Sequence, residues 1–231
     1  MYQSILTFLI LIAYTSLNAQ DKTMTFSDFD ELSVSTSIKL ELIPSNENKA
    51  EITIIKGDLD DLIVDQTRGE LEFRFKSQNN WGKNNQRKAE ITLYYKTRLE
   101  SIDVNAGASV YSNEVMEATE FSADVNSGAS LDLIMNAERI DSDVNSGGRM
   151  EIEGKVNSLV VDVDSGGHFD GAKLLAKDVE ADADSGGYAK VFASESIRAQ
   201  ANSGGSIKYK GDPKKEKIKK DKWSGGSVRK M

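Results

Sequence analysis

The sequence contains no cysteine, one histidine and two prolines among its 231 residues. Without cysteine the chain forms no disulfide, no thiolate metal site and no lipid-modified cysteine. The single histidine, His168, excludes a histidine-rich zinc site, and any Ser–His–Asp triad would depend on it alone. We therefore predict neither a metal nor a cofactor.

Long hydrophobic runs are also scarce. The one marked run, residues 5–17, is too short to span a bilayer, which takes about 20 residues. Because Asn18, Ala19 and Gln20 follow it, the run predicts a secretory signal peptide over residues 1–19, cleaved after Ala19. The segment before it lacks Lys and Arg, so a buried N-terminal strand or helix is the alternative. We predict an exported protein of the periplasm or cell surface, not an integral membrane protein.

The formal net charge is −8, and residues 1–19 contain no Asp, Glu, Lys, Arg or His, so the charge survives cleavage. An acidic chain argues against nucleic acid as a partner. The hydrophobic content of 39% and charged content of 29% are ordinary for a soluble folded protein.

A short motif recurs through the C-terminal part, as DVNAGAS, DVNSGAS, DVNSGGR, DVDSGGH, DADSGGY, QANSGGS and KWSGGSV. The first glycine of each motif lies 21, 19, 19, 20, 18 and 21 residues before the first glycine of the next. A period near twenty indicates stacked coils. These glycines are Gly107, Gly128, Gly147, Gly166, Gly186, Gly204 and Gly225.

Apolar and polar residues alternate on both sides of each motif, which is typical of strands with one buried face. We predict an all-β fold: an N-terminal β region over residues 20–100, then a parallel β-solenoid of about seven short coils over residues 101–231. The inward positions before each turn are Ile102 and Val104, Ala123 and Val125, Ser142 and Val144, Val161 and Val163, Ala181 and Ala183, and Ala199 and Ala201.

The glycines predict a sharp turn at the same point of every coil, because a positive φ angle is easily adopted only by Gly. A β-branched residue at Gly147 or Gly166 should therefore be costly. A phosphate-binding loop is the alternative, but no motif has G-x-G-x-x-G between a strand and a helix, nor a G-K-[ST] ending.

Acidic residues recur at one outward position, so stacking would align them about 4.8 Å apart. A second outward row comprises Asn105, Asn126, Asn145, Asp164, Asp184 and Asn202. For its Asn members, side-chain amide hydrogen bonds along the ladder are the expected explanation. For the Asp row, repulsion of roughly 1 kcal/mol per pair in water has to be offset, by solvent and counterions or by calcium. This candidate ligand or cation face comprises Asp103, Asp124, Asp143, Asp162 and Asp182.

Two further segments have unusual composition. Trp81 lies in a polar loop, residues 77–88, where it either packs back onto the domain or forms a carbohydrate-stacking platform. We expect residues 213–222 to place lysines where earlier coils have Val and Ala. These lysines either protect a terminal edge strand from further pairing or form a basic patch for an anionic glycan or membrane.

Several of these stretches resemble a known family of exported bacterial proteins. They are FDELSVSTSIKLELIPS, GELEFRF, the turns VNSGAS and VDSGGH, and the closing IKYKGDP and WSGGSVRK. From about Phe26 to Met231 the chain is similar to the "putative auto-transporter adhesin, head GIN domain" family, although Ser-Gly-Gly here replaces that family's usual Ser-Gly-Ser-Gly or Ala-Gly turns. The resemblance implies a β-helical secreted or surface protein, and it carries over no catalytic residues.

Two functions follow from this pattern. The first is a non-catalytic cell-envelope protein, an adhesin or scaffold whose rigid face binds an envelope protein or a glycan. The second is a carbohydrate-active enzyme, because parallel β-helices host polysaccharide-cleaving sites built from clustered Asp. Such sites need special residues on one or two coils, whereas these Asp residues repeat uniformly, so we favour the first.

Overall fold

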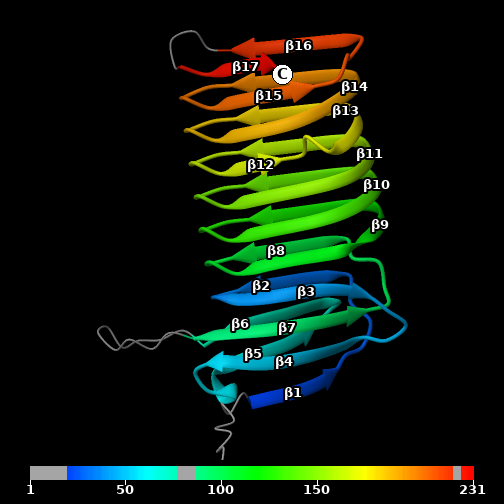
Figure 1. The fold of residues 1–231 in the computed structure, drawn as a ribbon, viewed down its shortest axis with the longest axis vertical. Helices are drawn as coiled ribbons and strands as arrows, with labels where there is room; N and C mark the ends of the chain where they lie inside the picture. The colour runs from blue at the N-terminus through cyan, green and yellow to red at the C-terminus, as the bar shows by residue number, and fades with distance from the viewer. Residues whose placement is uncertain (1–19, 77–86, 221–224) are drawn as a thin grey trace, which may run out of the picture.

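The computed structural model describes residues 20–76, 87–220 and 225–231. Within these ranges seventeen strands join one continuous sheet that winds into a solenoid (Figure 1), which confirms the predicted all-β fold. No helix in the described ranges has the length and hydrophobicity to cross a membrane. The predicted signal peptide and Trp81 lie outside the described residues.

Each coil has two strands, one on a pre-turn face and one on a post-turn face, named for the tight turns of the repeat motif. The pre-turn face consists of β6 (Glu70–Phe75), β2 (Glu31–Ser35), β8 (Ser101–Asn105), the second parts of β9 (Ser109–Val125), β10 (Ser130–Val144), β11 (Arg149–Val163), β13 (Leu174–Ala183) and β14 (Tyr188–Ala201), and β16 (Lys215–Lys220). The post-turn face consists of β7 (Lys88–Tyr95), β3 (Ile38–Pro44), the first parts of β9, β10, β11 and β14, and β12 (His168–Asp170), β15 (Ser206–Lys210) and β17 (Ser227–Lys230). Neighbouring strands within each face are parallel.

The N-terminal coils do not stack in chain order. The coil β2–β3 lies between β6–β7 on one side and β8–β9 on the other, because β2 pairs with both β6 and β8. Parallel coils therefore already form within residues 20–100, ahead of the first glycine turn. The antiparallel strands β1 (Gln20–Thr25), β4 (Lys49–Lys56) and β5 (Leu62–Thr67), with the short 3-10 turn Leu59–Asp61, close this end (Figure 1).

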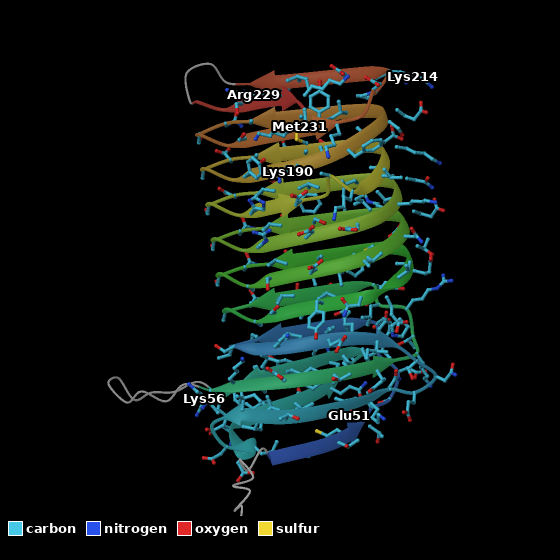
Figure 2. The ribbon with its side chains drawn as sticks, viewed as in Figure 1. Glu51, Lys56, Lys190, Lys214, Arg229 and Met231 are labelled. Atoms are coloured by element: carbon cyan, nitrogen blue, oxygen red, sulfur yellow. The ribbon has the colours of Figure 1, made fainter. Side chains whose placement is uncertain are left out.

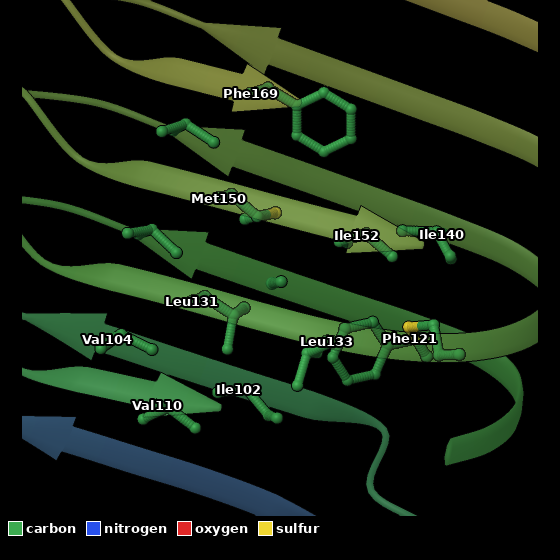
Figure 3. Close-up of a cluster of buried hydrophobic side chains, with 14 of the residues drawn as sticks. Ile102, Val104, Val110, Phe121, Leu131, Leu133, Ile140, Met150, Ile152 and Phe169 are labelled. Atoms are coloured by element: carbon green, nitrogen blue, oxygen red, sulfur yellow. The ribbon is translucent and has the colours of Figure 1, made fainter. Parts of the chain in front are cut away.

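The core is a column of apolar side chains between the two faces (Figure 3). All twelve inward positions predicted before the turns are buried, and the facing strands supply residues such as Val110, Leu131, Ile152 and Phe169. Alanine prevails toward the C-terminal end, at Ala181, Ala183, Ala189, Ala199 and Ala201. The coils there are consequently built from smaller inward residues.

The turns align along one edge of the solenoid (Figure 1) and follow one geometry. In Asn126-Ser127-Gly128-Ala129 the N–H of Ala129 donates to the carbonyl of Asn126 at 3.1 Å, and φ is 54° at Ser127 and 71° at Gly128. Positive φ at both central residues defines a type I′ turn. The seven first glycines have φ between 71° and 81°, and the residue before each of the first six, from Ala106 to Ser203, has φ between 44° and 54°.

The second glycine of each Ser-Gly-Gly turn has a different role from the first. Its φ is not positive, but a Cβ atom added at Gly167 would lie 2.1 Å from the carbonyl oxygen of Val144 in the preceding coil. Gly148, Gly187, Gly205 and Gly226 are in the same situation. In the five turns with a glycine pair, the second glycine is therefore required by the close approach of stacked coils, although Ala108 and Ala129 occupy this position in the first two turns; only the first glycine is required by backbone conformation.

One turn contains no glycine. Between β2 and β3, Thr36 and Ser37 have φ angles of 67° and 57°. Their N–H groups donate to the carbonyls of Asn105 and Ala106 in the neighbouring turn, both at 3.4 Å. This coil has the geometry of the repeat without its sequence signature.

The lysines near the C-terminus do not occupy the predicted positions. In β16, Lys217 and Lys219 pair in register with Arg198 and Gln200, which are outward positions. Ile218 keeps the inward register opposite Ala199, and only Lys220 pairs with an alanine, Ala201. The expectation that lysines replace inward Val and Ala residues is therefore wrong for most of the segment, because the alternation of the strand persists.

The two glycines of one turn should respond differently to substitution. Gly166→Ala meets nothing within 4 Å and should cost roughly 1 kcal/mol of left-handed strain. Gly167→Ala forces Cβ against a backbone carbonyl and should cost about 3 kcal/mol through displacement of adjacent coils. Denaturant unfolding of the two variants tests this, and equal losses would contradict the assigned roles.

Candidate functional site

The predicted acidic residues form one continuous row on the pre-turn face. Asp103 pairs in register with Asp124, Asp124 with Asp143, Asp143 with Asp162, and Asp162 with Asp182. The row is bounded by Ser33 at one end and Gln200 at the other. Because neighbouring strands lie about 4.8 Å apart, each interior carboxylate has a like-charged neighbour on both sides.

The surroundings of the row disfavour its charge. Partial burial is the main cause that raises the pKa of each of the five carboxyls, and charged neighbours add to it. For Asp143 those neighbours are Asp124, Asp162 and Asp141. The row is therefore a place where the folded protein holds protons, or attracts cations, more strongly than isolated carboxylates would.

Basic residues terminate the row toward the C-terminal end. Arg198 Nη1 lies 3.2 Å from Glu180 Oε1, and Lys219 follows Gln200 in register. Both cations lower the pKa of Asp182 against the larger effects of burial and of Asp162. The sign of the charge on this face consequently changes within two strands of Asp182.

The second outward row lies in the turns themselves. The backbone carbonyls of Asn105, Asn126 and Asn145 accept the hydrogen bonds that close the type I′ turns. Hydrogen bonds from Ser203, from the Ser185 N–H and from Asn202 lower the pKa of Asp184. Within the described residues no Asn side chains of this row hydrogen-bond to each other, so the expected amide ladder is wrong. The Asp164 and Asp184 carboxylates instead accept hydrogen bonds from the Ser165 and Ser185 N–H groups of their own turns, and Asp184 also accepts one from the Asn202 side chain in the next coil.

The acidic row does not assemble a coordination shell. Among the residues that the structure describes, no three Asp, Glu or His side chains are placed to hold one metal ion. Calcium favours six to eight converging oxygens, and a straight row presents one carboxylate per coil. Solvent and diffuse counterions remain our prediction for what offsets its charge.

His168 stacks on Tyr188, with ring centroids 4.8 Å apart. Burial lowers its pKa, and the charges of Arg149 and Lys190 lower it further. Within the described part of the chain His168 has no hydrogen-bonded serine or carboxylate partner. The arrangement of a Ser–His–Asp triad is thus not present around this histidine.

A row of cations on the post-turn face was missed in the sequence. Lys190 pairs in register with Lys208, and Lys208 with Arg229. The ammonium groups of Lys190 and Lys208 lie 5.7 and 5.4 Å from the ring centroid of Tyr188, so the ring positions both. All three residues stand four places after the first glycine of their motif, a signal visible when the repeats are aligned.

Substitution of two aspartates should have opposite effects on stability. The pKa of Asp143 is raised above its ordinary value of 3.8, so the folded state favours the protonated carboxyl. Asp143 therefore does not weaken the fold at acidic pH, but it reduces the stability as the pH rises and the carboxyl ionises. Asp143→Asn should therefore stabilise the fold at pH 7, by at most about 1 kcal/mol because the site is partly solvated, and should have no effect near pH 4.

Asp170→Asn is the matched control on the other face. Burial opposes ionisation of Asp170, but hydrogen bonds from Lys190 at 2.7 Å and from the Ala172 N–H lower its pKa overall. The ionised Asp170 carboxylate stabilises the fold at neutral pH, and this stabilisation is lost on acidification. The Asp170→Asn variant should therefore have a free energy of unfolding about 1 kcal/mol lower at pH 7. Thermal melting at both pH values tests the pair, and a shift of the same sign at pH 7 would refute the assignment.

The acidic row should also make stability depend on salt. Screening weakens repulsion along the row, so the melting temperature should rise gradually with sodium chloride. Calcium chloride at equal ionic strength should add little, because no coordination shell is present among the described residues. A melting temperature that saturates at low calcium would show a specific site, and an unchanged one in all salts would show that the row is not a liability.

Comparison with known proteins places this geometry in a family. The family model described as "putative auto-transporter adhesin, head GIN domain" matches residues 28–213. Comparison with curated proteins gave no match. A solved structure of a "putative adhesin" from Bacteroides fragilis NCTC 9343 is 20% identical, with a TM-score of 0.80 over 94% of this chain and 98% of that one.

Two solved structures from Parabacteroides distasonis ATCC 8503 have the same fold. A "putative adhesin" is 18% identical, with a TM-score of 0.70 over 92% of this chain and 97% of its own. A "putative lipid binding protein" is 19% identical, with a TM-score of 0.65 over 93% and 97%. At these identities the likeness shows the fold alone, whereas the family model covers most of the chain. The chain therefore belongs to the "putative auto-transporter adhesin, head GIN domain" family.

Proposed function

We propose that the protein is a non-catalytic, exported component of the cell envelope that binds partners through its rigid solenoid faces. Family membership supports a role in adhesion. The observation that carries the proposal is the uniform register of the outward side chains, which repeats one arrangement over five consecutive coils. Such a surface suits an extended partner better than a single small substrate.

The same uniformity argues against a carbohydrate-active enzyme. A glycosidase needs an acid and a base or nucleophile in different environments, so that their pKa values separate. The five aspartates of the row all have raised pKa values, and burial is the main cause at each. No coil of the row is therefore distinguished as a reaction centre.

The site of action is proposed from the N-terminal sequence and the family. Residues 1–19 have the pattern of a signal peptide, and export would place the protein in the periplasm or at the cell surface. Its partner would be an envelope protein, a glycan or another envelope component. The name "putative lipid binding protein" of one structural relative adds lipid to the classes worth testing.

A paired binding and turnover assay tests the proposal. The purified protein should bind saturably to a glycan or to an isolated envelope fraction, and should release no product from a panel of polysaccharides. Asp143→Asn should leave the absence of turnover unchanged. Cleavage of any polysaccharide that is abolished by a single Asp substitution would overturn the non-catalytic assignment.

A further inference from the structure

Charge is distributed very unevenly along the solenoid. Residues 206–231 contain ten of the 29 Lys and Arg residues but only three of the 37 Asp and Glu residues. The C-terminal coils are therefore strongly basic, although the chain as a whole is acidic. A rod with such a charge asymmetry has one end suited to an anionic partner.

The basic side chains lie on both faces of that end, where Figure 2 labels Arg229. Lys215, Lys217 and Lys219 lie on β16 of the pre-turn face, whereas Lys208 and Arg229 lie on β15 and β17 of the post-turn face. We call these five residues the basic collar. The three β16 lysines and Arg229 are exposed, and Lys208 is partly exposed.

The collar is not neutralised by the protein. Nearby Lys214 and Lys230 form ion pairs with Glu195 and Asp212, at 3.0 and 2.6 Å. Within the described residues no collar residue has a carboxylate within ion-pair distance. Glu216, the acidic residue inside β16, accepts a hydrogen bond from the Tyr209 hydroxyl at 3.2 Å instead.

Protection of an edge strand does not account for the whole collar. Lysines on the outermost strand β16 would discourage further pairing. Lys208, however, lies on β15, which is paired on both sides, with β14 and β17. Lys190 in the same column is paired with Asp170 at 2.7 Å, but Lys208 and Arg229 stack about 4.8 Å apart without such a partner among the described residues, an arrangement that is repulsive and gains from an external anion.

We propose that the basic collar docks this end of the solenoid onto an anionic lipid surface, with the rod axis pointing away from the membrane. A flat surface can meet cations from both faces at once, because Lys and Arg side chains are long enough to extend past the last strands. A single polymer strand would follow only one face. The inference rests on the proposed envelope location and names the attachment surface.

In this orientation the acidic row lies far enough from the anionic lipid to avoid strong repulsion. Asp182 is two strands from Lys219, about 10 Å, and the other aspartates lie further along the axis. That separation equals the Debye length at about 0.1 M salt, so repulsion between the row and the lipid is largely screened when the rod stands on its end. Side-on contact would bring the whole row against the membrane.

Vesicle co-sedimentation tests the proposal. The full chain should bind phosphatidylcholine vesicles containing roughly 30 mol% phosphatidylglycerol at about 0.1 M salt, but not pure phosphatidylcholine, and should be released at about 0.5 M salt. The variants K215E/K217E/K219E and K208E/R229E should each bind these vesicles at least about tenfold more weakly.

The matched control is K22E/K155E/K177E, which makes the same charge change as the triple variant at exposed lysines away from the collar. It should retain binding within about twofold. Circular dichroism and thermal melting confirm that each variant is folded, and the double variant provides a second measurement if the triple variant does not fold.

Three outcomes would overturn the proposal: no binding to the anionic vesicles, equal loss in the control, or collar-dependent binding to soluble heparin without vesicle binding. The third would identify a polyanionic glycan as the ligand. If the protein still bound a glycan or an envelope fraction but not the vesicles, the membrane-docking proposal would be rejected and the proposed binding function would stand. Polysaccharide cleavage, by contrast, would reject the non-catalytic function and leave the vesicle result standing.

Discussion

Parallel strands hydrogen-bond along their whole length only when equivalent residues stay in register about 4.8 Å apart. That constraint determines most of this molecule. It requires every coil to turn at the same point, which explains the type I′ geometry at each glycine turn. It also leaves no room for a Cβ atom where turns of adjacent coils touch, as at Gly167. The shape of each coil is thus set by its neighbour as much as by its own sequence.

The same register converts a sequence period into columns of charge. One outward position becomes the row from Asp103 to Asp182, and another becomes the column of Lys190, Lys208 and Arg229. The two columns lie on opposite faces and toward different ends. Within a column the charges repel. Because the acidic and basic columns lie toward different ends, the rod has a charge asymmetry along its axis. Orientation in an external field or at a charged surface follows from the fold without any special binding loop.

Much of this architecture could be predicted from the sequence, because glycine spacing and strand alternation both reflect local geometry. The buried residues before each turn and the alignment of the aspartates followed directly from them. The turn at Thr36 and Ser37 could not be predicted, since stacking on the Asn105 turn holds two non-glycine residues at positive φ. The placement of β2 between β6 and β8 was also missed, because a parallel strand pairs equally well on either edge.

Comparison of magnitudes explains why the surface can carry unfavourable charge at all. Burying one large apolar side chain contributes about 1.5–3 kcal/mol, and a single coil buries several, such as Leu131, Leu133 and Met135. Repulsion between stacked, partly solvated aspartates is about 1 kcal/mol per pair or less. In such a coil the core therefore outweighs the cost of the outward residues. Outward positions can therefore vary in charge without loss of the fold.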